Sequence, residues 1–282
     1  MMSGIRSICV VIFWLLATAI IQAQEPEVGP KSGSLYIVGG GRMPAEMVDR
    51  FIEMAGGKSV PFVVIPTAGG ALTYSDESGE FLRNRGATDV TVLHTFDREL
   101  ADTEKFCAPL KKAKAVWFGG GRQWRLVDAY KDTLMEKSFH EVLARGGVIG
   151  GSSAGATIQG SYLARGDTRN NQIMMGDHEV GFGFLKNTAI DQHAIARNRH
   201  FDLFQILAKR PELLGIGIDE ETAIEVKGDR FVVSGSSYVM VYDGNFWSRE
   251  GSSLKKLPPR ESLFYFLRPG DRYDLKKRAV VR

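Results

Sequence analysis

The sequence predicts an α/β fold, in which helices cover both faces of a mostly parallel sheet and antiparallel hairpins follow. Three observations support this. Strand-like runs alternate with helical stretches over residues 35–150, as in βαβ units. Several runs are apolar throughout, which indicates strands buried on both faces. After about residue 224, short apolar runs are separated by turn residues, which is typical of hairpins.

The elements of the first half follow in order. A helix is expected over residues 44–55, because Pro44 suits the first turn of a helix. The expected strands share an apolar composition, and they cover residues 35–38, 61–65, 89–93, 113–118 and 147–150.

The second half contains further strand-like runs and no internal repeat. Strands are expected at residues 187–192, 214–218, 224–226, 231–233 and 238–242, with turns at 227–229 and 243–245. Residues 24–34 are polar and contain two prolines, so a linker is expected there. A single α/β domain is then expected over residues 35–282.

The composition excludes several classes of protein. Of 282 residues, 44% are apolar and 24% are charged, which is typical of a globular chain and not of a disordered one. The formal net charge is only +3, so neither nucleic acid nor an anionic membrane is expected as a partner.

The N-terminus has the pattern of a secretory signal. Arg6 precedes an uncharged run over residues 8–21, which is too short for an ordinary transmembrane helix. Ala23 is the expected last residue of the signal, with Ala19 as the alternative. The competing interpretation is an uncleaved anchor, because Ile21 fits the cleavage pattern poorly. Residues 1–23 thus predict a secreted or periplasmic protein without stable membrane association after cleavage.

Cleavage would leave Cys107 as the one cysteine of the mature chain, because Cys9 lies inside the signal. One cysteine allows no internal disulfide. Cys107 has no basic or histidine neighbour that marks a nucleophile, so a buried structural thiol is expected.

Three of the expected strands end in glycine-rich segments, and ligands of open α/β sheets collect at such ends. Residues 39–41 are three glycines, but Pro44 stands where a dinucleotide-binding pattern needs its last glycine, so a tight turn is the better interpretation. Residues 119–121 offer free backbone N–H groups before Arg122 and Gln123, although a simple turn explains them too.

The third end, residues 151–155, matches the G-x-S-x-G pattern centred on Ser153. This pattern predicts a nucleophile elbow, a sharp strand-to-helix turn that exposes the serine Oγ. The N–H of Ala154 would face a developing oxyanion, and Gly120 or Gly121 could supply a second donor. The alternative is a helix N-terminus that holds an anion or nothing.

A serine nucleophile needs a base and an orienting acid. Of the five histidines, His193 follows an expected strand and has polar and cationic neighbours; His200 is a weaker substitute. Residues 219–221, which are Asp-Glu-Glu after the strand at 214–218, are candidates for the acid. Asp191 is the local rival.

Four segments together resemble the cyanophycinase and dipeptidase E-like serine peptidases over about residues 35–245. They are Gly-Gly-Gly-Arg-Gln at 119–123, Gly-Gly-Ser-Ser-Ala-Gly-Ala at 150–156, Asp-Gln-His-x-x-x-Arg-x-Arg at 191–199 and Gly-Ile-Gly-Ile-Asp-Glu at 215–220. The third is the most specific and looks closer to cyanophycinase. The resemblance implies a class I glutamine amidotransferase-like fold, with Ser153 as nucleophile, His193 as base and Glu220 as acid.

The resemblance also implies the substrate class and its contacts. Family members cleave peptide bonds next to aspartyl residues, including the isopeptide bonds of an arginine–aspartate polymer. The implied contacts are Gln123, Asp191, Gln192, Arg197 and Arg199. Two arginines can bind a substrate carboxylate, and Asp191 could bind a substrate cation. Arg122 replaces an acid that is usual in cyanophycin-cleaving members, which puts an arginine-bearing substrate in doubt.

We therefore expect an exported serine hydrolase that needs no metal and no organic cofactor. No H-E-x-x-H or cysteine pattern for zinc occurs. The alternatives are a non-catalytic module that binds anions or peptides on the same fold, and a dinucleotide-dependent enzyme based on residues 39–41 alone. The oligomeric state stays open, a homodimer included.

Overall fold

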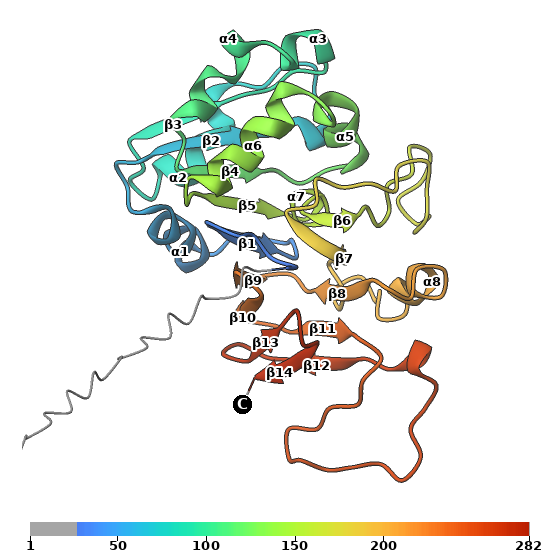
Figure 1. The fold of residues 1–282 in the computed structure, drawn as a ribbon. Helices are drawn as coiled ribbons and strands as arrows, with labels where there is room; N and C mark the ends of the chain where they lie inside the picture. The colour runs from blue at the N-terminus through green and yellow to red at the C-terminus, as the bar shows by residue number, and fades with distance from the viewer. Residues whose placement is uncertain (1–26, 282) are drawn as a thin grey trace, which may run out of the picture.

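The computed structural model describes residues 27–281, which form two β-sheets with helices around them (Figure 1). The first sheet holds β1 (Ser34–Val38), β2 (Pro61–Ile65), β3 (Asp89–Val92), β4 (Ala115–Phe118), β5 (Val148–Ser152), β9 (Thr222–Lys227), β10 (Arg230–Gly235), β13 (Arg272–Asp274) and β14 (Ala279–Val281). The second holds β6 (Gly160–Tyr162), β7 (Leu185–Gln192), β8 (Leu214–Ile218), β11 (Val239–Tyr242) and β12 (Tyr265–Leu267).

The helices lie mostly in the first half of the chain. They are α1 (Ala45–Ala55), α2 (Glu80–Arg83), α3 (Arg98–Ala101), α4 (Glu104–Cys107), α5 (Trp124–Tyr130), α6 (Leu134–Ala144), α7 (Ala154–Thr157) and α8 (Leu203–Leu207). Short 3-10 turns occur at Thr67–Gly69, Asp76–Gly79, Ala108–Lys111 and Arg260–Ser262.

The first sheet confirms the predicted fold class. Its strands run in the order β14-β13-β10-β9-β1-β5-β4-β2-β3, and the five from β1 to β3 are parallel to one another. The sheet changes from parallel to antiparallel pairing at β1, because β1 is parallel to β5 on one side and antiparallel to β9 on the other.

The parallel strands are apolar throughout because both of their faces are covered. On β1, Leu35 and Ile37 join the core under α5 and α6, whereas Tyr36 and Val38 join the core under α1. Helix α1 packs so closely that a Cβ on Gly150 would lie 2.5 Å from a ring carbon of Phe51. Glycine at this position therefore sets the distance between helix and sheet.

The division into two sheets was not predicted. Strand β7 pairs in parallel with β6 and β8, and none of these three joins β5. Helix α7 lies between the two sheets, where it contacts β1, β4 and β5 of the first and β7 of the second. The carboxyl ends of β5, β7 and β8 consequently converge.

The C-terminal part is antiparallel, as predicted. Strands β9 and β10 form a hairpin through the expected turn at residues 227–229. Strands β11 and β12 also pair, but the turn at 243–245 begins a long connection and not a tight hairpin (Figure 1). Residues of β6, β7, β11 and helix α8 contribute to a third, smaller core.

The described part of the expected linker, residues 27–33, is packed against the body of the protein. The carboxylate of Asp229 accepts the backbone N–H groups of Glu27, Val28 and Gly29 at 2.8–3.1 Å. The predicted signal, residues 1–23, lies outside the described residues. Among residues 27–281, no helix has the length and apolarity needed to cross a membrane. Cys107 is buried as expected, and burial raises the pKa of its thiol.

Candidate active site

Ser153 lies at the sharp turn between β5 and α7. Its backbone adopts φ 56° and ψ −111°, which is strained for a residue with a side chain. Small neighbours make the turn possible: a Cβ on Gly151 would lie 2.3 Å from the carbonyl oxygen of Gly155, and one on Gly155 would lie 2.1 Å from that of Phe118. The predicted glycine pattern is therefore explained by close backbone approach.

His193 follows β7 in the second sheet and reaches across to Ser153. Its Nε2 lies 2.8 Å from Ser153 Oγ, and its Nδ1 lies 2.5 Å from Oε1 of Glu220. Glu220 follows β8. The structure thus joins the three predicted catalytic side chains in one hydrogen-bonded chain, drawn from three strand ends.

His193 is only 4% exposed. Burial lowers its pKa, the hydrogen bond that Nδ1–H donates to Glu220 opposes this, and the nearby cation of Arg197 adds to the lowering. The net pKa lies below the ordinary histidine value, so the ring is neutral near pH 7. A neutral Nε2 can accept a proton from the Ser153 hydroxyl, which is the protonation state that a base requires.

The glycines at residues 39–41, expected to form only a turn, contact this histidine and its acid. Gly40 has φ 125°, and a Cβ there would lie 2.2 Å from Cε1 of His193. A Cβ on Gly41 would lie 2.8 Å from Cβ of Glu220. The Gly39 carbonyl also accepts the His193 N–H at 2.9 Å. The sequence signal for this contact was the position of residues 39–41 directly after the strand at residues 35–38.

The second glycine loop lies beside the serine. A Cβ on Gly120 would lie 3.5 Å from Ser153 Cβ, and Gly121, with φ 139°, packs against the carbonyl of Ala68. Within the described part of the chain, the backbone N–H groups of Gly121 and Ala154 have no hydrogen-bond acceptor. Both therefore remain available to an oxyanion.

The five predicted substrate contacts differ in exposure. Gln123 is fully buried, and its Nε2 donates to the carbonyls of Ala164 and Arg165 at 2.6 and 3.0 Å. Its Oε1 has no partner among residues 27–281. Arg197 alone of the five is exposed.

The other three predicted contacts are turned inward. Asp191 is 1% exposed and accepts two hydrogen bonds from Arg165. Gln192 Oε1 accepts from Arg199 at 2.5 Å, and both side chains are buried. Burial lowers the pKa of Arg199. Asp191 was the local rival for the orienting acid, but Glu220 holds His193.

The four remaining histidines make contacts elsewhere. His94 bonds to Thr67, His140 to a backbone carbonyl, His178 to two aspartates and His200 to Asn198. Among residues 27–281, no group of three or more His, Cys, Asp or Glu side chains is arranged to hold a metal ion.

Sequence reasoning missed two further elements of the site. Asp219 accepts the backbone N–H groups of Ile195 and Ala196 at 3.0 and 2.8 Å, and thereby holds the turn after His193. Arg165, a fully buried cation, binds Asp191. An arginine inside the apolar run at 162–165 was a possible signal for the second.

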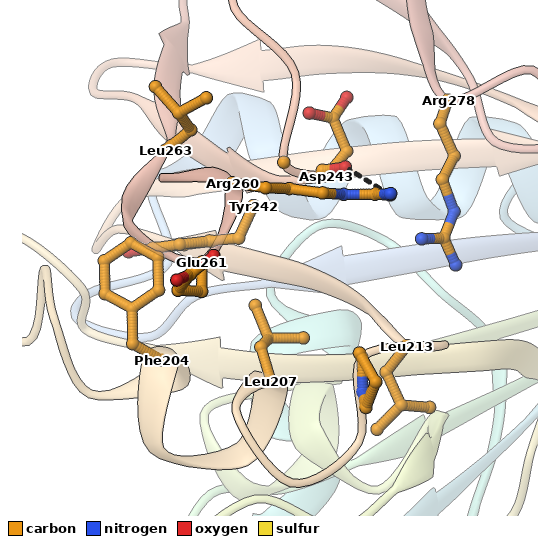
Figure 2. A pocket seen from close by; sticks show the side chains of 11 residues that line it. Phe204, Leu207, Leu213, Tyr242, Asp243, Arg260, Glu261, Leu263 and Arg278 are labelled. Carbon is orange, nitrogen blue, oxygen red and sulfur yellow. Dashed lines mark hydrogen bonds between the residues drawn. The ribbon is translucent and has the colours of Figure 1, made fainter. Parts of the chain in front are cut away.

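A separate cavity of about 120 Å³ lies between α8 and the segment after β11 (Figure 2). Phe204, Leu207 and Leu263 form apolar walls, and Arg260 donates to the Asp243 carbonyl across it. None of its lining residues belongs to the chain of Ser153, His193 and Glu220. The candidate active site is therefore defined by that chain and not by this cavity.

A family model for peptidase family S51 matches residues 35–234. The chain belongs to this family. It is a serine-type peptidase, and its substrate is a peptide.

Curated relatives and solved structures agree with this assignment. A cyanophycinase of Geminocystis herdmanii is 30% identical over 86% of this chain and 94% of the relative. A cyanophycinase of Trichormus variabilis is 28% identical over 84% and 82%. The crystal structure of a peptidase from an acI-B1 actinobacterium has a TM-score of 0.61 at 27% identity, and the match covers 86% of this chain and 97% of that one.

Proposed function

We propose that this peptidase is exported and hydrolyses aspartyl peptide or β-aspartyl isopeptide bonds through an acyl-enzyme on Ser153. The observation that carries the mechanism is the hydrogen-bonded chain from Ser153 through His193 to Glu220, with links of 2.8 and 2.5 Å. This is the arrangement that makes a serine hydroxyl nucleophilic.

In the first half-reaction, Ser153 Oγ attacks the carbonyl carbon while His193 Nε2 takes its proton. The strained turn at Ser153 acts as the nucleophile elbow, because it holds Oγ toward His193. The N–H groups of Gly121 and Ala154 receive the oxyanion. His193 then gives the proton to the departing amine, and the acyl group remains on Ser153.

In the second half-reaction, His193 takes a proton from water, which attacks the acyl carbon and releases the acid. Glu220 orients the imidazole through Nδ1 and stabilises the imidazolium in both halves. Each proton that His193 accepts is returned, to the amine or to Ser153, so the enzyme is regenerated without a co-reactant.

The substrate class is supported by the relatives that are named cyanophycinase and by two arginines. Arg197 is exposed close to His193, and Arg122 follows the glycine loop that faces Ser153. Among residues 27–281, no carboxylate lies within ion-pair distance of either guanidinium, although Arg122 Nη2 donates to the backbone carbonyl of Asp167. Two unneutralised cations favour a substrate with free carboxylates and disfavour an arginine side chain.

Export is supported by the apolar run at residues 8–21, and residues 27–29, after this run, are attached to Asp229. Cleavage after Ala23 would remove the signal and leave that attachment intact. Fractionation of cells that express the full chain, with the mass of the product, tests this. We expect a periplasmic or extracellular product that begins at Gln24; a full-length product in the membrane fraction contradicts it.

The function is tested by amine release from α- and β-aspartyl dipeptides with arginyl, neutral and acidic leaving residues, and from the arginine–aspartate polymer. Wild type is compared with Ser153→Ala and with Arg122→Glu; Arg230→Glu, on β10, is the matched charge control. We expect turnover by wild type and none by Ser153→Ala. Arg122→Glu should shift preference toward arginyl substrates, and Arg230→Glu should not.

Two results would contradict the proposal. Turnover by Ser153→Ala at the wild-type rate would exclude the serine mechanism. No turnover by folded wild type on any member of the panel would exclude aspartyl bonds as the substrate.

A further inference from the structure

Arg165 is the largest fully buried side chain among the described residues, and the mechanism above does not use it. A charged group without solvent is strongly destabilising unless it is paired and hydrogen-bonded. Here every nitrogen of the guanidinium has a partner. Nε and Nη2 donate to the two carboxylate oxygens of Asp191 at 2.8 and 3.0 Å, Nη2 also bonds to Asp202, and Nη1 donates to the Asn171 carbonyl at 2.9 Å.

The two carboxylates that bind Arg165 stand at the two ends of one loop. Asp191 is the second-to-last residue of strand β7, two residues before His193, and Asp202 immediately precedes α8. Residues 192–201 between them carry the base. This loop contains two residues with positive φ, His193 at 53° and Asn198 at 53°. A loop with such a backbone persists when the surrounding contacts fix it.

Arg165 also connects the loop at residues 192–201 to the segment that lies beside Ser153. The backbone carbonyl of Arg165 accepts a hydrogen bond from Gln123 Nε2 at 3.0 Å. Gln123 follows the glycine loop in which Gly120 faces Ser153. Arg165 therefore contacts, through its side chain and backbone, both segments that flank the reacting groups.

The charges in this group, which is buried except for the partly exposed Asp202, are balanced. Arg165 and Arg199 are the two cations, Asp191 and Asp202 the two anions, and Arg199 Nη1 lies 3.7 Å from Asp191 Oδ1. Asp191 also accepts the Gln192 N–H at 2.9 Å. Asp191 is 1% exposed and already binds Arg165 and Gln192, so a substrate cation could reach its carboxylate only if these contacts were rearranged.

We infer that Arg165 is a positioning residue that holds both ends of the His193 loop, and that Asp191 is its structural counter-ion and not a substrate ligand. The inference rests on the proposed role of His193. It assigns Arg165 no contact with substrate. Bidentate geometry is essential, because one guanidinium must bind Asp191 with two nitrogens and still reach Asp202.

The test uses variants that separate positioning from folding. Arg165→Lys keeps the charge but loses the bidentate geometry. Asp202→Asn removes one anchor at the half-exposed end, where the Asp202 side chain is 30% exposed, so the fold is expected to survive. Arg85→Met is the matched control, because Arg85 binds Asp49 in the same bidentate way on the surface near α1.

The primary readout does not depend on turnover. The mature protein is labelled with [15N]histidine. The Nδ1–H resonance and the apparent pKa of His193 then report its hydrogen bond to Glu220, and the His193→Gln variant assigns the signal. We expect folded Asp202→Asn and Arg165→Lys to lose or broaden this resonance and to shift that pKa, while Arg85→Met matches wild type. Circular dichroism and thermal unfolding establish that each variant is folded.

The second readout is kinetic. A loop that is displaced by about 1 Å lowers kcat by about 100-fold. We expect kcat to fall about tenfold in Asp202→Asn and about 100-fold in Arg165→Lys, with KM changing less than threefold. A KM that rises for cationic substrates while kcat and the resonance stay constant would overturn the inference, because Asp191 would then act as a substrate ligand. An unchanged resonance in both folded variants would overturn it as well. If wild type shows the His193 resonance and cleaves no aspartyl peptide, only the proposed function fails.

Discussion

The serine side and the histidine side of the site are built in different ways. Ser153 follows strand β5 of the first sheet and is positioned by the backbone. The backbone approaches closely at Gly151 and Gly155, and Ser153 itself has a strained φ. His193, at the end of the second sheet, is positioned by side-chain charges from distant segments, namely Glu220, Asp219 and the group around Arg165. The first kind of order is marked by a five-residue pattern packed against the neighbouring strand at Phe118, whereas the second depends on how the sheets meet.

The largest effect should come from the contact that joins the two sides through the base. Glu220→Gln keeps the size of the side chain but loses the negative charge that fixes the Nδ1–H tautomer of His193. We expect kcat to fall by about 10⁴-fold with the fold intact. Steady-state kinetics on the best substrate measures this. Glu221→Gln is the control, because Glu221 is one residue away and forms an ion pair with Arg42. Equal activity of the two variants would remove Glu220 from the mechanism.

A smaller effect should follow from crowding the histidine. Gly40→Ala would place a Cβ 2.2 Å from His193 Cε1, so we expect a fall in kcat of about 100-fold. Gly57→Ala is matched, since Gly57 has φ 108° and no atom within 4 Å of an added Cβ. Both variants carry backbone strain, and only the first should lose activity. A similar loss in Gly57→Ala would attribute the effect to strain and not to His193.

The pH dependence sharpens the account of the base. His193 must be neutral, so kcat/KM should fall as pH drops through its pKa, which burial holds below the ordinary histidine value. Arg197→Gln removes a cation that lowers this pKa, so the acid limb should move to higher pH. Arg230→Gln should leave the limb in place. An acid limb that moves to lower pH in Arg197→Gln would show that the electrostatic argument is wrong.

The smallest effect concerns His178. This residue lies in the segment before β7 and contacts α5, the helix that follows the glycine loop at residues 119–121. His178 bonds to Asp128 of α5 at 2.8 Å and to Asp177 at 2.9 Å. Partial burial lowers the His178 pKa, but the two carboxylates outweigh this, so the net pKa is raised. Its stabilising contribution is therefore complete below the unfolded histidine pKa and is lost as pH rises through the folded one.

Asp128→Asn should accordingly lower the free energy of unfolding by about 0.5 kcal/mol at pH 5.5 and by less at pH 9. Urea unfolding at the two pH values measures the difference. A larger loss at pH 9 would contradict the sign of this linkage.

The contrast between the two sides also explains what the sequence could predict. The parallel strands and the turn at Ser153 follow from local patterns of apolar residues and small residues. His193 could be chosen from five histidines by its place after a strand, and Glu220 followed from the family resemblance. The separation of these strands into a second sheet could not be predicted. It depends on the pairing of β6 with β7, which lie more than twenty residues apart, and β6 is only a short strand without a distinctive sequence pattern.

The buried partners were missed for the same physical reason. The family resemblance assigns Asp191 and Arg199 to substrate binding, in a motif next to His193. The structure adds that they bind Arg165 and Gln192 inside the protein, which the sequence did not indicate. Likewise, the sequence of residues 39–41 predicts a turn. Their contact with the site arises because the second sheet places the backbone N–H of His193 at 2.9 Å from the Gly39 carbonyl. Such roles are set by tertiary contacts, and the sequence offers only the residue types.

The central claim, that His193 from the second sheet activates Ser153 of the first, is tested most directly by covalent labelling. Mature protein is treated with a fluorophosphonate, which loses fluoride as the serine oxygen binds phosphorus, and the modified residue is located by peptide mass spectrometry. We predict rapid labelling of Ser153 in wild type and loss of labelling in His193→Gln. Labelling of Ser152 instead, or equal labelling of Ser153 with and without His193, would contradict the account.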